Sequence, residues 1–277
     1  MNIGSAKLQP EYLKRYPHAL IDIRDPEQSY SVAEFCADAT KAIEKAHVEQ
    51  KIPVLVGGTI MYFRALMQGL AGLPGADPAL RAKLEKRAEL EGWPALHEQL
   101  RSVDAHSAAR IAANDGQRIQ RALEVFFITG KPLSKQLGNP SRFDIKWRFL
   151  QLVITPCDRH VLHQRIKQRV TSMLSEGFIE EVERLRDRSN LSEKSSSMRS
   201  VGYRQVWMML EGKLKRSQLE SEIVAATRQL AKRQLTWLRQ MPGTIWINGL
   251  PTSADEGLDE SIEQAFIVNR VKNFASN

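Results

Sequence analysis

A basic segment between residues 199 and 239 carries the side chains best suited to bind a nucleic acid. Residues 191–240 hold ten Lys or Arg and four Glu, so six of the eight net positive charges of this 277-residue chain lie there. Tyr203 and Trp237 stand among these cations. Cations bind backbone phosphates, and aromatic rings stack on bases. The segment therefore indicates a nucleic-acid surface, with a solvated basic helix face as the alternative.

The turn Gly57-Gly58-Thr59 is a second candidate site. It follows the apolar run 52–56 and precedes a helix expected to carry Met61 and Leu66. Glycines let backbone amides approach an anion, a threonine hydroxyl adds a donor, and the positive end of a helix favours negative charge. The turn therefore predicts phosphate binding, although tight turns also use glycine for steric reasons alone.

Two arginines could act together on one anion. Arg165 and Arg169 are four residues apart in a segment whose apolar residues repeat at helical spacing, so they lie on one helix face. The alternative is a pair of solvated arginines on a polar face.

Cysteine and histidine give no sign of a metal site. Cys36 and Cys157 are too far apart in the sequence to suggest a disulfide framework or a metal motif. His160 and His163 have no partner spaced to complete a ligand set, and we expect both at the surface.

The elements around these residues predict an α/β fold with a helical insertion. We expect a βαβ unit at the start, because Ser31 and Glu34 form a capping box before a helical pattern that lies between two apolar runs. The expected strands are residues 20–23, 52–56, 149–155 and 244–248. Further helices are expected after Asp158, over 206–210 and 223–238, and at 258–273.

The middle of the chain carries helical patterns and no strand pattern. The expected helices are residues 79–91, 94–102, 104–111 and 115–129, the last ending at the C-cap Gly130. We therefore expect three parts: core residues 1–72, a helical insertion at 73–142, and a second core part with RNA-binding helices at 143–277.

Composition sets the cellular context. No apolar run approaches the ~20 residues of a membrane span, and no hydrophobic region of a signal peptide follows Met1. We expect a cytoplasmic monomer without a membrane partner.

Four motifs together closely resemble bacterial tRNA dimethylallyltransferases. In order, they are Pro53-Val54-Leu55-Val56-Gly57-Gly58-Thr59, Asn114-Asp115-x-Gln117-Arg118-x-x-Arg121-Ala122-Leu123-Glu124-Val125, Arg199-x-Val201-Gly202-Tyr203-Arg204-Gln205 and Lys232-Arg233-Gln234-x-Thr236-Trp237-Leu238-Arg239. The resemblance implies a P-loop-type parallel sheet core with an all-helical insertion domain. It also implies transfer of a dimethylallyl group from its diphosphate to the exocyclic amine of the adenosine 3′ of the anticodon.

The resemblance also implies roles for particular residues. Thr59 corresponds to a threonine near the reacting adenosine, and Arg169 to an arginine that handles the diphosphate beside Gly57 and Gly58. Mg²⁺ is implied as the cofactor, and the anticodon stem-loop of tRNA and dimethylallyl diphosphate as partners. The implied tRNA contacts are Thr59, Arg81, Gln117, Arg118, Ile119, Gln120, Arg121, Arg199, Ser200, Val201, Gly202, Tyr203, Arg204, Lys232, Arg233, Gln234, Leu235, Thr236, Trp237, Leu238 and Arg239.

The sequence departs from the family pattern at its start. Residues 1–7 match the family's Met-Asp-Ile-Gly-Thr-Ala-Lys, which follows a Gly-x-x-x-x-Gly-Lys-Thr loop and a strand carrying an aspartate general base. This sequence contains neither. We therefore expect a core that lacks its first strands, and weak tRNA binding without useful transfer. The alternatives are a catalytically inactive tRNA-binding protein and an unrelated phosphate-transfer enzyme.

Overall fold

The computed structural model describes residues 1–137, 147–156, 158–248 and 257–275. The chain forms two compact units, one of residues 1–63 and 148–277 and the other of residues 64–147. The first unit contains α1 (Pro10–Arg15), α2 (Val32–Val48), the start of α3 (Ile60–Gln68), β1 (Leu152–Thr155), α9 (Arg159–Ser175), α10 (Phe178–Arg186), α11 (Tyr203–Leu210), the 3₁₀ turn η1 (Arg216–Gln218), α12 (Leu219–Leu238), β2 (Ile245–Asn248) and α13 (Gly257–Ala275).

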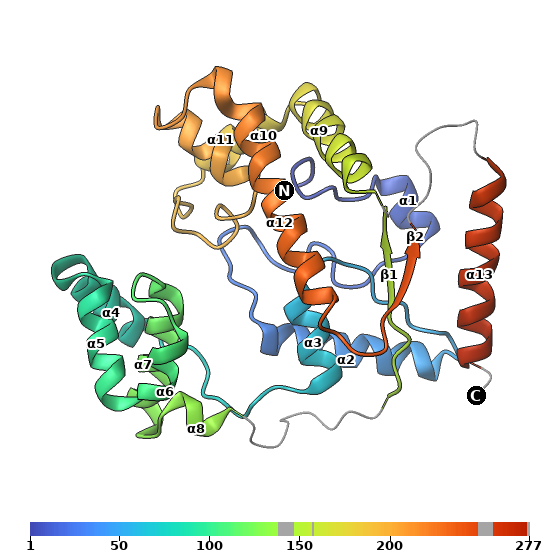
Figure 1. Ribbon diagram of the computed structural model, residues 1–277. Coiled ribbons are helices and arrows are strands. Elements are labelled where there is room, and N and C mark those ends of the chain that lie inside the picture. The colour runs from blue at the N-terminus through green and yellow to red at the C-terminus, as the bar shows by residue number, and fades with distance from the viewer. Residues whose placement is uncertain (138–146, 157, 249–256, 276–277) are drawn as a thin grey trace. The chain divides into compact units, whose positions relative to one another are not determined.

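The sheet of the first unit is small and parallel. β1 pairs with β2 in register from Leu152 opposite Ile245 to Thr155 opposite Asn248. Helices α9 to α12 lie between these strands in the chain (Figure 1), as a parallel pairing requires a long crossover. The expected α/β class, with parallel pairing, is confirmed.

Two of the four expected strands are wrong. Leu20 and Asp22 have φ of 63° and 54°, a left-handed conformation that cannot continue a strand. Residues 52–56 have no paired partner among the described residues, and Val54 and Val56 are 75% and 82% exposed. The apolar run predicted a strand buried between two neighbouring strands, but no described strand lies beside residues 52–56. The expected βαβ unit is therefore not formed here.

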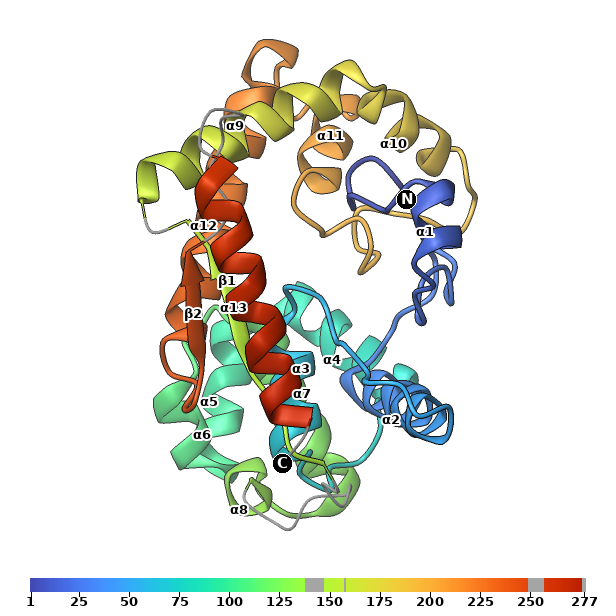
Figure 2. The same cartoon turned by 90° about the vertical axis from the view of Figure 1, so that its right-hand side faces the viewer.

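The core of the first unit lies where α9, α10, α11 and α12 pack together. Phe178, Val182 and Val206 are completely buried there, and the Phe178 ring meets Tyr203 edge to face. The N-terminal residues lie beside α10 in both views (Figures 1 and 2). Burial of large apolar side chains is the main stabilising term for such a helix cluster.

The second unit consists of helices. These are α4 (Pro78–Glu91), α5 (Trp93–Val103), α6 (Ala105–Arg110), α7 (Gly116–Thr129) and α8 (Leu133–Gln136), preceded by the rest of α3. Its core comprises buried residues of α4, α5 and α7, including Leu96, Leu100 and Leu123. Gly130 ends α7 with φ of 68°, as its C-cap position predicts.

Candidate RNA-binding surface and phosphate-binding turn

The end of α12 and the residue after it carry three exposed cations of the basic segment. Lys232, Arg233 and Arg239 are exposed, and Trp237 is 44% exposed. An open depression of about 310 Å³ is lined by Gln229, Lys232, Arg233, Thr236 and Trp237. This surface therefore combines cations with one accessible ring, a pairing suited to a single-stranded nucleic acid.

Gln234 joins this helix to the Gly-Gly-Thr turn. Its Nε2 donates to the backbone oxygen of Gly58 at 2.8 Å. Thr59 is exposed, and its carbonyl accepts from the Tyr62 amide in the first turn of α3. Two segments 176 positions apart, both singled out in the sequence, are therefore neighbours in the structure.

The segment from Arg199 to Arg204 contains structural and exposed residues. Arg199 and Arg204 are exposed, whereas Gly202 and Tyr203 are buried. Gly202 has φ of 90°, and a Cβ there would lie 3.1 Å from the Phe178 ring. Only glycine combines this backbone with this close approach.

Tyr203 cannot serve as a stacking surface. Its ring is 1% exposed, and its hydroxyl donates to Glu181 Oε1 at 2.6 Å. The expectation of two stacking rings is therefore wrong for Tyr203, because its ring belongs to the core. Trp237 is the accessible ring of the pair.

Glu181 binds the start of the chain. Its carboxylate accepts from the backbone amides of Asn2 at 2.7 Å, Ile3 at 3.0 Å and Gly4 at 3.4 Å. Burial raises the pKa of Glu181, but the hydrogen bonds from Tyr203 and from these amides outweigh it, so the pKa lies below its usual range. Glu181 thus remains ionised and holds residues 2–4 against α10.

Helices α9 and α12 pack together and bring further cations close. Arg169 is exposed and Arg165 half-buried on α9. The pKa of His163 on α9 is lowered by burial, and also by the charges of Arg228 on α12 and Arg159. Arg228 and Arg159 therefore place positive charge near His163.

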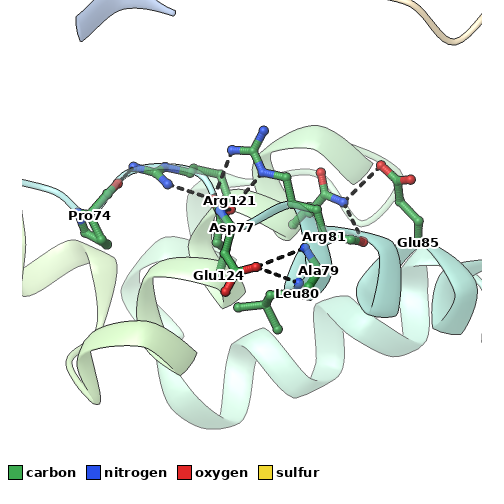
Figure 3. A network of polar contacts seen from close by, with 9 residues as sticks. Pro74, Asp77, Ala79, Leu80, Arg81, Glu85, Arg121 and Glu124 are labelled. Carbon is green, nitrogen blue, oxygen red and sulfur yellow. Dashed lines mark hydrogen bonds and ion pairs between the residues drawn. The ribbon is translucent and has the colours of Figure 1, made fainter. Parts of the chain in front are cut away.

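In the second unit, Arg81 and Arg121 share one carboxylate (Figure 3). Glu124 is completely buried, and Arg81 donates to it through Nε at 2.7 Å and Nη2 at 3.0 Å. Arg121 Nη1 donates to it at 2.7 Å. Burial raises the pKa of Glu124, but these hydrogen bonds outweigh it and lower the pKa below its usual range.

The neighbouring residues of α7 differ in accessibility. Gln117 and Arg118 are exposed, and Arg118 pairs with Asp115 at 2.9 Å. Ile119 is completely buried, and Gln120 is 8% exposed and donates to the backbone oxygen of Arg81. The side chains of Ile119 and Gln120 therefore face the interior of the second unit.

Metal-binding clusters and membrane-spanning helices are both absent from the described residues. These residues contain no group of three or more His, Cys, Asp or Glu placed to hold a metal ion. No helix described here has the length and apolar character needed to cross a membrane. Cys157 lies outside the described residues.

Known proteins similar to this chain agree on one family. The family model described as IPP transferase matches residues 1–241. The chain belongs to this family. It is 49% identical to the tRNA dimethylallyltransferase of Paraburkholderia xenovorans over 95% of this chain and 84% of the relative. It is also 49% identical to tRNA dimethylallyltransferase 2 of Hahella chejuensis over 95% of this chain and 83% of that protein.

Solved structures of the family have a similar fold. The tRNA isopentenylpyrophosphate transferase of Bacillus halodurans matches with a TM-score of 0.66 and 33% identity, over all of this chain and 85% of that one. A eukaryotic dimethylallyltransferase acting on tRNA matches with a TM-score of 0.69 at 24% identity, over 96% of this chain and 69% of that one, which shows the fold alone. The sequence resemblance to the IPP transferase family is thus confirmed.

Two buried glutamates among the described residues were not predicted from the sequence. Glu124 stands three positions after Arg121 inside an apolar helix, a spacing that could have indicated an ion pair. Glu181 gave no such signal, because its partners are backbone amides at the far end of the sequence.

Proposed function

We propose that the chain modifies tRNA by transferring a dimethylallyl group from dimethylallyl diphosphate to the exocyclic amine of the adenosine 3′ of the anticodon. The observation that carries the proposal is membership of the IPP transferase family over residues 1–241. The relatives are tRNA dimethylallyltransferases, which supports transfer of a dimethylallyl group to tRNA. The diphosphate donor and the adenosine 3′ of the anticodon follow from the sequence resemblance.

The anticodon stem-loop would bind to the basic surface. Exposed cations of α12 and of the 199–204 segment are suited to backbone phosphates, and Trp237 is suited to an unpaired base. A base inside a stacked loop must be extruded before its amine can react. The open depression beside Trp237 supports binding of such a single-stranded loop.

The diphosphate needs fixed donors where its charge grows. The allylic C–O bond breaks with negative charge developing on the diphosphate, so amides and cations held in place lower the barrier. We assign this role to the turn Gly57-Gly58-Thr59 and to Arg169. The hydrogen bond from Gln234 to Gly58 supports a reaction site beside the RNA-binding helix.

Mg²⁺ is the cofactor that membership of the family implies. The described residues hold no carboxylate cluster that would fit it.

A direct assay tests the proposal. The purified chain is incubated with dimethylallyl diphosphate and unmodified tRNA, and the anticodon-loop fragment is examined by mass spectrometry. Transfer would appear as a mass gain of one dimethylallyl group on the adenosine 3′ of the anticodon, abolished by replacing that adenosine. We expect this gain to be small, because the sequence contains neither the Gly-x-x-x-x-Gly-Lys-Thr loop nor the strand with the aspartate general base. A chain that binds neither tRNA nor the diphosphate would contradict the proposal.

The same assay separates the alternative, a tRNA-binding protein without transferase activity. Salt-dependent tRNA binding without any mass gain would favour it. The outcome also tests the expectation that this chain transfers no group at a useful rate.

A further inference from the structure

The carboxylate of Glu124 organises one polar cluster in the second unit (Figure 3). Besides the two arginines, it accepts from the backbone amide of Asp77 at 2.9 Å. Asp77 is the N-cap of α4, and its side chain accepts from the amides of Ala79 and Leu80. One buried acid on α7 thus fixes the start of α4 and two cations.

The two guanidinium groups converge on that carboxylate and remain partly exposed. Arg81 and Arg121 both donate to Glu124 Oε2, at 3.0 Å and 2.7 Å. Arg121 also donates to the Pro74 carbonyl at 2.8 Å. The Arg81 and Arg121 side chains are 39% and 30% exposed. Each uses two of the five N–H donors of an arginine in these contacts, so both retain donors for an outside anion.

Two arginines share this one acid. Arg81 gives the carboxylate two parallel hydrogen bonds, and Arg121 and the Asp77 amide occupy its remaining acceptor sites. Arg81, Arg121 and Glu124 together carry one net positive charge, which is partly exposed and held in place by the shared carboxylate, and Glu85 acts on Arg81 as a further negative charge. Phosphate is an anion that guanidinium forks recognise well.

We propose that Glu124 is a positioning residue that holds Arg81 and Arg121 together as one preformed clamp for the phosphate backbone of tRNA. This inference rests on the proposed function. Fixing the two arginines before RNA arrives reduces the side-chain entropy lost on binding. Glu124 itself touches no RNA in this arrangement, because it is completely buried.

The test compares two glutamate substitutions in the full chain. Glu124→Gln removes the buried charge, and Glu98→Gln removes one exposed charge of the same unit that pairs with Arg101 at 2.8 Å. Binding of an RNA hairpin with the sequence of an anticodon stem-loop is measured over a range of salt concentrations, below the melting temperature of each variant.

Of the two substitutions, only Glu124→Gln should weaken binding. Loss of a negative charge alone strengthens attraction to RNA, and we expect Glu98→Gln to bind equally or more tightly. Glu124→Gln should instead bind roughly tenfold more weakly, with the slope of log K against log salt smaller by about 0.7–0.9 for each phosphate that the arginines no longer neutralise. Equal affinity and equal slope for the two folded variants would overturn the proposal.

Lysine substitutions cover the case in which Glu124→Gln does not fold. Arg81→Lys and Arg121→Lys keep the charge but lose the planar fork. We expect each to weaken hairpin binding, and full affinity in both would show that charge alone matters and overturn the proposal. If the unaltered chain bound no hairpin at any salt concentration, both the clamp proposal and the proposed function would be refuted. If the unaltered chain and folded Glu124→Gln bound the hairpin equally well, the clamp proposal would be refuted and the proposed function would stand.

Discussion

Two glutamates of this chain are buried and yet ionised, for different reasons. Glu124 is matched by two arginines, whereas Glu181 is matched mainly by dipoles, namely three backbone amides and the Tyr203 hydroxyl. An ionised carboxylate held by several donors can tolerate burial that would otherwise neutralise it. Each residue therefore stabilises the contacts around it only while it is charged.

We expect Glu181→Gln to destabilise the first unit by about 1–3 kcal/mol, since an amide cannot accept hydrogen bonds from all four donors. Thermal unfolding followed by circular dichroism measures the change. The matched control is Glu180→Gln, one position earlier on α10 and exposed. Equal melting temperatures for the two variants would contradict the role given to Glu181.

The pH dependence of this effect has a defined sign. Because the folded pKa of Glu181 is lowered, its contribution is fully present above the unfolded value of about 4.3. The contribution is lost as the pH falls through the lower folded pKa. The difference in stability between the unaltered chain and Glu181→Gln should therefore shrink below about pH 4.3.

Trp237 offers a test of stacking at the basic surface. Trp237→Ala should weaken binding of the anticodon hairpin by about 1–3 kcal/mol, because a base loses its stacking partner. Trp237→Phe should recover part of the affinity. Trp246→Ala, which removes a similarly exposed ring from β2, is the control and should leave affinity unchanged. Fluorescence anisotropy with a labelled hairpin measures all three.

The sequence identified candidate RNA-binding residues, but it did not show which of their side chains are exposed. Lys232, Arg233 and Trp237 lie exposed on α12, in keeping with the RNA-binding role predicted for them, and this role remains a prediction. Tyr203 belongs to the same set of motifs, but its ring fills the core. A spacing pattern cannot distinguish these cases, because side chains of α10 distant in sequence decide whether the ring is covered.

At the scale of elements, most helices were predicted, but α1, α8 and the core helix α10 were not, and two of the four expected strands were wrong. The capping box of Ser31 and Glu34 is present at the start of α2. It can be recognised from the sequence because its two residues are only three positions apart. Strands depend on partners elsewhere in the chain. Residues 52–56 have strand composition, but no described segment pairs with them. The predicted domain boundaries at 72 and 142 remain predictions.

The turn before α11 should be sensitive to a single methyl group. Gly202→Ala places a Cβ 3.1 Å from the Phe178 ring on a backbone with φ of 90°. We expect a loss of about 2–4 kcal/mol, from backbone strain and overpacking together. Gly212→Ala is the matched control: its φ is also positive, but a Cβ there meets nothing within 4 Å. Denaturant unfolding should show the larger loss for Gly202→Ala.

At the scale of the whole molecule, Glu124 and Glu181 stabilise separate units. The hydrogen-bond donors described above for Glu181 lie in the unit of residues 1–63 and 148–277, and those for Glu124 in residues 64–147. Local opening is cooperative within such compact regions. The effects of the two substitutions should therefore map to different parts of the chain.

Hydrogen exchange measured by mass spectrometry can check this separation. Glu181→Gln should speed exchange in residues 1–7 and in α10 and α11, and leave α4 and α7 unchanged. Glu124→Gln should do the reverse, because the amide of Asp77 and the start of α4 depend on it. Equal loss of protection in both units from either substitution would refute the separation.

The hydrogen bond from Gln234 to Gly58 has a thermodynamic consequence. Under the proposed function, an RNA that orders the end of α12 would also restrict Gln234 and, through it, the Gly58 carbonyl. A diphosphate binding next at the turn would then lose less conformational entropy. Affinity for each of these two proposed ligands would rise when the other is present, and the linkage would be equal in both directions.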